Sequence, residues 1–233
     1  MEQEALHMTV LDPEKFDTET IAQKGKIAEE QGTDIIAIGG SMNVIELDDK
    51  VMAVKRVVHV PVLLFPSNLW SISKYADAIL FLRLINSRNS YYSSDISILA
   101  APILRQMGIE SIPTGYLLFE PGESAGWISD AKLIPRNNLS IAAACALAAI
   151  YTGAHFICME AGSGATIPIE GKIIREVKKV CPMPLIVGSG IRTPEQAKHA
   201  VESGADIVDT GSIFEESGSI RRIVNAIKGA KRK

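Results

Sequence analysis

The sequence contains few aromatic residues, few cysteines and almost no excess charge. Phe, Trp and Tyr make up 6% of its 233 residues, and the formal net charge is −3. Since nucleic-acid-binding domains carry a basic stripe, often with interleaved aromatics, we expect no nucleic-acid partner. Three cysteines cannot all pair and none has CxxC spacing, which argues against a disulfide scaffold or a structural zinc site and favours a reduced, cytoplasmic setting. The acidic start, Met1 to Glu4, also lacks the basic residues of a signal peptide, so no export is expected.

One stretch without Asp, Glu, Lys or Arg runs from Ile141 to Met159 and has the length of a membrane span. Thr152 and Gly153 interrupt it, so the pattern favours a buried helix that ends at a glycine cap and leads into a strand. The basic end, Lys228 to Lys233, predicts a solvated tail that suits a helix C-terminus. Peripheral contact of this tail with anionic lipid headgroups is the alternative.

Short runs rich in Val, Ile and Leu alternate with helix-length amphipathic stretches, a rhythm typical of a parallel sheet built from βα units. The predicted strands are His7–Leu11, Asp34–Ile38, Val62–Phe65, Ala78–Leu84, Ile112–Phe119, His155–Met159, Leu185–Val187 and Ile207–Val208. The predicted helices are Thr18–Gln31, Val44–Val58, Asp95–Met107, Leu139–Thr152, Pro168–Val180, Pro194–Ser203 and Ser219–Lys228. No linker divides the chain, so we expect a single α/β domain over residues 1–233, a TIM (β/α)8-type barrel.

Two connections depart from the regular rhythm. The third gap, Pro66 to Asp77, is too short and too rich in serine for a full helix, which predicts a barrel with a degenerate third helix. The connection from Pro121 to Pro135 is longer than most and has the size of a lid or an interface element. We expect Trp127 in this insert to pack against another subunit or against the mouth of its own barrel.

Three turns with small residues each follow directly after a predicted strand: Gly162-Ser163-Gly164, Gly188-Ser189-Gly190 and Thr210-Gly211-Ser212. Small residues let backbone N–H groups approach an anion, and a helix that begins after such a turn adds free N–H groups. In TIM barrels phosphate commonly binds the loops after strands seven and eight, where the second and third turns fall. Each turn alone could be a tight connection only, but the three together predict a phosphate site.

Oxygen-bearing side chains stand at the ends of three predicted strands. Asp12 closes the first strand and Ser41 follows the second, so a carboxylate and a hydroxyl are expected side by side at the C-terminal ends of neighbouring strands. Mg²⁺ is usually held in this way, by one or two protein oxygens together with water and substrate phosphates. Glu160 ends the sixth strand and is a candidate general base. The alternatives are that Asp12 and Ser41 cap a turn or a helix, and that Glu160 only supports the loop that follows it.

These motifs resemble the geranylgeranylglyceryl phosphate synthase family, the archaeal ether-lipid prenyltransferases and their bacterial heptaprenyl relatives. The resemblance covers nearly the whole chain and is carried by Leu11–Pro13, Gly39–Ser41, Ile85–Asn89, Ile112–Tyr116, Gly126–Trp127, Glu160–Ala165, Val187–Ile191 and Gly211–Ser212. It implies transfer of a geranylgeranyl group from geranylgeranyl diphosphate to the 3-hydroxyl of sn-glycerol 1-phosphate, the first ether bond of archaeal membrane lipids. It also implies Mg²⁺ as cofactor and a barrel whose third helix is missing or replaced. A homo-oligomer is expected.

The resemblance assigns roles to residues of this chain. Asp12 and Ser41 are expected to hold Mg²⁺ on the diphosphate, and Glu160 is expected to take the proton of the attacking hydroxyl. The residues expected to bind glycerol 1-phosphate are Cys158, Met159, Glu160, Ala161, Gly162, Ser163, Gly164, Gly188, Ser189, Gly211 and Ser212. One departure is that the family usually has Tyr-Leu-Glu where this chain has Cys158-Met159-Glu160, so a phenolic contact is absent or comes from elsewhere.

Two other classes of function fit the same scaffold. A phosphosugar isomerase or a flavin enzyme would use the same terminal phosphate loops, and an isomerase would need an acid/base pair, for which Asp12 and Asp209 are candidates. The second class is a non-catalytic barrel that binds glycerol phosphate as a regulatory ligand and acts as an RNA-binding regulator, and the net charge of −3 counts against it. Formation of a prenylated product would support the prenyltransferase. A bound yellow chromophore would support the flavin enzyme, and binding of the ligand without turnover would support the regulator.

Overall fold

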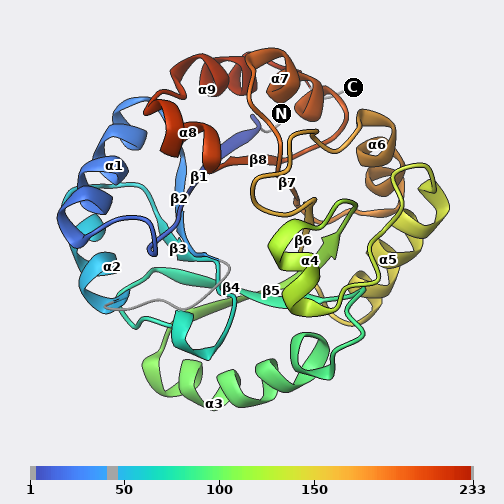
Figure 1. Ribbon diagram of the computed structural model, residues 1–233, viewed down its shortest axis with the longest axis horizontal. Helices are drawn as coiled ribbons and strands as arrows, with labels where there is room; N and C mark the ends of the chain where they lie inside the picture. Colours follow the sequence, from blue (N-terminus) through green and yellow to red (C-terminus); the bar gives the residue numbers. More distant parts are fainter. Residues whose placement is uncertain (1–3, 41–46, 232–233) are drawn as a thin grey trace.

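Eight parallel strands close into one barrel in chain order. The computed structural model describes residues 4–40 and 47–231, and the barrel stands at the centre of this part of the chain (Figure 1). The strands are β1 (Leu6–Leu11), β2 (Ile35–Ile38), β3 (Val62–Leu64), β4 (Ala78–Leu84), β5 (Glu110–Leu118), β6 (Phe156–Glu160), β7 (Leu185–Val187) and β8 (Ile207–Thr210). Pairing of Leu6 with Ile207 and of Thr9 with Thr210 joins the first strand to the last. The predicted TIM-type fold is confirmed.

Among the described residues, seven helices surround the barrel, and Figure 1 shows them as a ring. They are α1 (Thr18–Glu30), α2 (Leu47–Lys55), α3 (Ile96–Met107), α5 (Leu139–Tyr151), α6 (Gly171–Val180), α7 (Pro194–Glu202) and α9 (Arg221–Lys228). Local side-chain capping helps to set where these helices begin and end. At α7, the Thr193 side chain accepts from the N–H of Gln196 at 3.2 Å while the Gln196 side chain accepts from the N–H of Thr193 at 3.0 Å, and the two bonds form a capping box. Of the described residues, no helix is long and apolar enough to cross a bilayer.

The third helix of the ring is missing. Between β3 and β4 the chain forms only a single 3-10 turn, η1 (Leu69–Ser71), which Asn68 caps by accepting from the N–H of Trp70 at 2.8 Å. This agrees with the degenerate connection predicted from the serine-rich gap. The outer faces of β3 and β4 therefore lack a helix between α2 and α3 (Figure 1).

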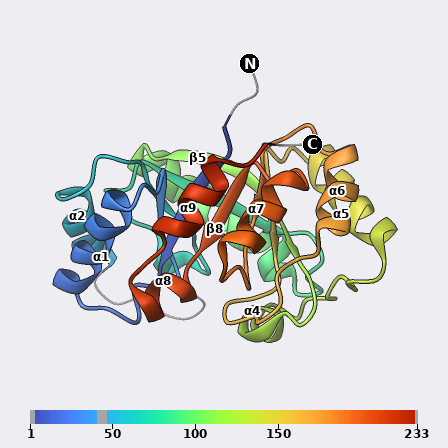
Figure 2. The ribbon, with the colours of Figure 1, turned by 90° about the horizontal axis from the view of Figure 1, so that it is seen from above.

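Two short helices lie at the end of the barrel where the strands terminate, the barrel mouth (Figure 2). One is α4 (Glu123–Ser129), within the insert that the sequence indicated. The other is α8 (Ser212–Ser217), which the sequence analysis missed because six residues are too few to show a helical period. The sequence signal that could have indicated α8 is the pair of glycines around it. Gly211 precedes the helix, and Gly218 ends it with φ of +65°.

Alternation along the strands decides which side chains enter the barrel. Met8, Leu80, Cys158, Ile186 and Ile207 belong to the cluster that fills the interior. The neighbouring side chains on β6 and β8, Met159 and Val208 among them, pack outward against the helices. Because side chains alternate with a period of two, residues two positions beyond Cys158 and Ile207 also face inward. Those residues are Glu160 and Asp209.

A buried histidine connects β1 to the loop before β2 and to the end of β8. The ring of His7 has Nδ1 at 2.8 Å from the Thr33 hydroxyl and Nε2 at 3.0 Å from the Thr210 hydroxyl. Burial lowers the pKa of His7 from 6.5 to about 4, although the nearby Asp34 carboxylate acts in the opposite direction. His7 is therefore neutral in the folded protein at neutral pH.

The His7 pKa predicts acid sensitivity of the fold. In the unfolded chain His7 takes up a proton near pH 6.5, and in the folded protein only near pH 4. The free energy of unfolding should thus fall as the pH drops through this window, by about 3 kcal/mol in all. Urea unfolding across the window should show a smaller fall for His7→Asn than for the wild type. The exposed His155→Asn serves as control, and equal slopes for His7→Asn and wild type would contradict the assignment.

Trp127 on α4 is 87% exposed, so packing against its own barrel mouth, one of the two predicted outcomes, is wrong. Contact with another subunit stays a prediction. If it is correct, Trp127→Ala should shift the assembly to a smaller species, because removing a large buried aromatic anchor costs an interface several kcal/mol. Light scattering after size exclusion measures this mass. Trp70→Ala, at a second exposed tryptophan, should leave it unchanged, and a monomeric wild type would refute the prediction.

Candidate active site

A cavity of about 240 Å³ opens at the barrel mouth and has a polar and an apolar side. The polar side consists of the three predicted turns and the strand ends that carry them. The apolar side lies where the third helix is missing and continues over the outer face of β4 towards α3. Its lining side chains include Leu69, Ile72, Ile79, Phe81, Ile96 and Ala100.

The turn after β6 is held by close backbone packing. Gly162 adopts φ of +92° and lies against the carbonyl of Gly122, so that an added Cβ would overlap this carbonyl. A left-handed conformation in contact with another backbone admits only glycine. The turn therefore depends on the insert that contains α4, and it directs Ser163 and Gly164 into the cavity.

Ser189 joins the turn after β7 to the turn after β6. Its hydroxyl accepts from the N–H of Ala161 at 3.1 Å and donates to the carboxylate of Glu160. Ser189 itself has φ of +62°, a strained conformation for a residue other than glycine. Its two hydrogen bonds compensate this strain, because they tie the loop after β7 to the backbone and to the carboxylate at the end of β6.

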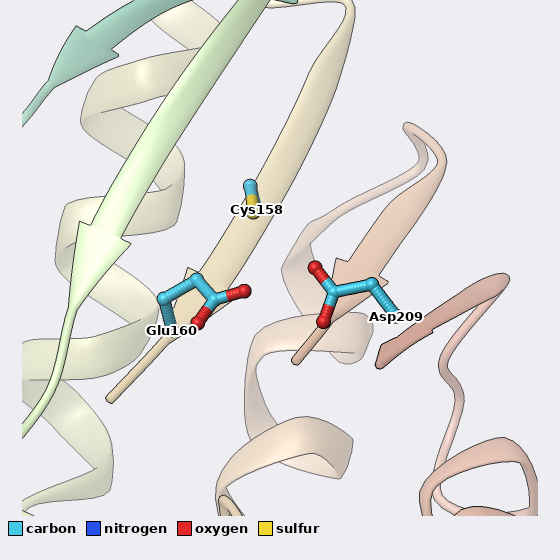
Figure 3. Close-up of side chains that lie close together, drawn as sticks. All are labelled: Cys158, Glu160 and Asp209. Carbon is cyan, nitrogen blue, oxygen red and sulfur yellow. The ribbon is translucent and has the colours of Figure 1, made fainter. Parts of the chain in front are cut away.

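Glu160 and Asp209 lie side by side inside the barrel mouth, and their carboxyl groups point towards each other (Figure 3). Both carboxyl groups lie against the same backbone position, Gly188. Cys158 lies deeper, with its Sγ and one oxygen of each carboxyl group within 4.8 Å of one another. Gly188 borders the pair, and a Cβ on Gly188 would overlap an oxygen of both carboxyl groups. The absence of a side chain at Gly188 is what leaves room for the pair.

Burial raises the pKa of both acids above their ordinary values. For Asp209 the charge of Glu160 acts in the same direction, and the pKa is raised well above its usual range. For Glu160 the hydrogen bonds from Asp209 and Ser189 oppose the effect of burial. The upward shift of the pKa is therefore larger for Asp209 than for Glu160.

Asp12 follows β1 at the other side of the mouth. Its Oδ1 accepts from the N–H of Glu14 at 3.0 Å, and its Oδ2 lies 3.5 Å from the Lys15 ammonium, which also pairs with Glu215 at 2.7 Å. Gly40, the residue beside Asp12 on the neighbouring loop, lacks a side chain that would cover the carboxylate. Ser41, the second predicted metal ligand, lies outside the described residues.

The predicted glycerol phosphate residues fall into two groups. Glu160, Ser163, Gly164, Ser189, Gly211 and Ser212 line the cavity. The others surround this lining: Cys158 is buried inside the barrel, the Met159 side chain packs outward into the helix layer, and Ala161, Gly162 and Gly188 shape the turns. Met159 thus has only its backbone on the side of the site.

Sequence reasoning missed several residues of the mouth. Asp209 was considered only as a partner of Asp12 in an isomerase, whereas its neighbour in the barrel is Glu160. Tyr116 on β5, opposite Cys158 in register, lines the cavity, and burial raises the pKa of its phenol well above 10. Lys15 and Arg192 add positive charge at the rim. The period of two along β5 and β8 was the available signal for Tyr116 and Asp209.

The fold and the site define a TIM-barrel protein whose site lies at the C-terminal strand ends. The features that define it are a closed parallel barrel, small-residue loops after the last three strands, a buried carboxyl pair and an adjoining apolar groove. The comparisons with known proteins agree with this class. The chain belongs to the PcrB family, whose model matches residues 1–231.

Curated and solved relatives match over nearly their whole length. The geranylgeranylglyceryl phosphate synthase of Thermococcus kodakarensis is 46% identical over 95% of this chain and 89% of its own. The crystal structure of (S)-3-O-geranylgeranylglyceryl phosphate synthase from Thermoplasma acidophilum, in complex with substrate sn-glycerol-1-phosphate, is 39% identical with a TM-score of 0.94, over 97% of this chain and 94% of its own. The wild-type GGGPS of Thermoplasma volcanium is 40% identical with a TM-score of 0.95, over 100% and 96%.

Proposed function

We propose that this protein transfers a geranylgeranyl group from geranylgeranyl diphosphate to the 3-hydroxyl of sn-glycerol 1-phosphate. The observation that carries the proposal is the position of Glu160, a buried carboxylate where the polar turns meet the apolar groove. Relatives over 40% identical are named for this product, and one solved relative binds sn-glycerol-1-phosphate. We also expect a cytoplasmic homo-oligomer, with peripheral membrane contact through the basic C-terminal end as an addition.

The two sides of the cavity suit the two substrates. Backbone N–H groups and hydroxyls of the turns at Ser163-Gly164, Ser189-Gly190 and Gly211-Ser212 are donors for the phosphate of glycerol 1-phosphate. The apolar groove over β4 would take the prenyl tail, since removing a long hydrocarbon chain from water is strongly favourable. A groove of this kind exists because the third helix is absent.

Mg²⁺ would be held at Asp12, with Ser41, water and diphosphate oxygens as further ligands. The fit is good, because the uncovered carboxylate lines the cavity and Mg²⁺ usually binds through one or two carboxylates together with substrate phosphates. When bound there, it neutralises charge on the leaving diphosphate. The Lys15 ammonium beside Asp12 adds a positive charge at the same place.

Glu160 would act as the general base. As the bond between the glycerol 3-oxygen and the allylic carbon forms, the carbon–diphosphate bond breaks and the diphosphate leaves with the electron pair. The hydroxyl proton passes to Glu160, which Ser189 holds in place through its own hydroxyl. Enclosure of Glu160 makes its carboxylate a stronger base than one in water.

The proposal is tested by incubating the purified protein with Mg²⁺, labelled sn-glycerol 1-phosphate and prenyl diphosphates of different chain length. The expected product is the geranylgeranyl ether, and sn-glycerol 3-phosphate, the mirror-image substrate, serves as control. Binding of glycerol 1-phosphate without any product would contradict the proposal and favour the regulatory alternative.

The roles of Glu160 and Asp12 predict different kinetic defects. Glu160→Gln keeps the shape of the side chain but removes the base, so prenyl transfer should fall roughly 10²–10⁴-fold while binding of glycerol phosphate changes little. Asp12→Asn should weaken binding of Mg²⁺ and diphosphate, and excess Mg²⁺ should recover part of the rate because the ion keeps its other ligands.

Titrations of both variants with Mg²⁺ and with glycerol phosphate separate the two roles. Asp48→Asn, an exposed carboxylate on α2, is the matched control and should behave as the wild type. Near-normal turnover of Glu160→Gln would remove Glu160 as base. A defect of Asp12→Asn that does not respond to Mg²⁺ would remove Asp12 as metal ligand.

A further inference from the structure

We propose that Asp209 is a positioning residue that stays protonated and donates its proton in a hydrogen bond to Glu160, so that Glu160 is held ionised and aimed at the attacking hydroxyl. This inference rests on the proposed function, since it gives Asp209 a role in setting the catalytic base. It concerns a residue to which the resemblance assigns no role.

The first step is the contact itself. Glu160 and Asp209 are 8% and 3% exposed, and their carboxyl groups point towards each other with one oxygen of each within 4.8 Å of the other. Two ionised carboxylates this close in an enclosed site would repel each other, and neither could donate a hydrogen bond to the other. At least one proton must therefore stay on the pair while the contact exists.

The second step is the position of the proton. Glu160 already accepts from the Ser189 hydroxyl, which is itself oriented by the N–H of Ala161. The Oδ2 of Asp209, by contrast, is buried without a donor among the described residues. An ionised Asp209 would leave this oxygen charged and unsatisfied, which costs far more than a neutral carboxyl group. The proton therefore resides on Asp209, in agreement with the larger upward shift of its pKa.

The surroundings supply no other compensation for a second negative charge. The titratable neighbours are Tyr116 on β5 and Cys158 on β6, and burial raises the pKa of both, so both are neutral. From the remaining strands the interior side chains below the pair are apolar: Met8, Ala37, Leu63, Leu80 and Ile186. Among the described residues neither carboxyl group has an ion pair with a lysine or arginine. The pair thus carries one negative charge.

This charge state suits the reaction. Two donors, Ser189 and Asp209, restrain the Glu160 carboxylate from two sides. During prenyl transfer the 3-hydroxyl proton moves to Glu160 while the proton of Asp209 stays in place, so the pair passes from one negative charge to neutral. The site therefore never holds two negative carboxylates next to the substrate phosphate, which would repel it.

A direct test needs no turnover. Infrared spectroscopy of the wild type at neutral pH should show the C=O stretch of one protonated carboxyl group, and this band should disappear in Asp209→Asn. The control Asp48→Asn should keep it. Absence of the band from the wild type, or its persistence in Asp209→Asn, would overturn the proposal. Because substrates are not needed, a protein that shows the band but forms no product would disprove the proposed function alone.

The pH profile of kcat tests the positioning role. The amide of Asp209→Asn can still donate to Glu160, so kcat should stay within about tenfold of the wild type and the acid limb should barely move. Asp209→Ala removes the donor, so kcat should fall about 10- to 100-fold and the acid limb should shift to higher pH, because Glu160 remains buried with less stabilisation of its charge. A merely structural role would lower the unfolding midpoint without moving the limb. Equal profiles for Asp209→Asn and Asp209→Ala would refute the role of Asp209.

Discussion

Closure of eight parallel strands into a narrow barrel is the constraint on which the site depends. Every second side chain of each strand must enter the interior, and the lower interior is filled by apolar side chains such as Met8, Leu80 and Ile207. One step further along β6 and β8, the same alternation brings in Glu160 and Asp209. Two acids distant in sequence are thereby forced into contact away from water, and their chemistry follows from this contact.

The polar and apolar parts of the barrel mouth exist because certain glycines lack side chains and one connection lacks a helix. Glycines at Gly162 and Gly188 leave room for the Gly122 carbonyl and for the carboxyl pair, so the loops after β6 and β7 can approach each other closely. The connection after β3 lacks a helix, and an apolar groove lies there instead. A polar subsite and an apolar subsite therefore meet at one carboxylate. A reaction that joins a phosphorylated alcohol to a prenyl chain requires both.

The charged side chains of the barrel mouth form two separate groups. Asp12 with Lys15 and Glu215 forms a charged, water-accessible group at the rim, where a cation and a diphosphate can exchange. Glu160 and Asp209 lie in the enclosed part, where a single negative charge is retained by a shared proton. The Ser189 hydroxyl connects this enclosed charge to the backbone of the turn after β6.

The sequence by itself determined the strands, most helices and the three small-residue turns, because periodicity, capping residues and glycines act over a few neighbouring positions. Thr193 with Gln196, and the serine-rich gap before Asp77, are local signals of this kind. Only the tertiary structure decided that Trp127 is exposed, that Met159 faces away from the site and that Asp209 lies beside Glu160 rather than pairing with Asp12. These outcomes depend on barrel closure and on which strand lies beside which, so burial and proton sharing between distant residues are properties of the assembled barrel and of no single segment.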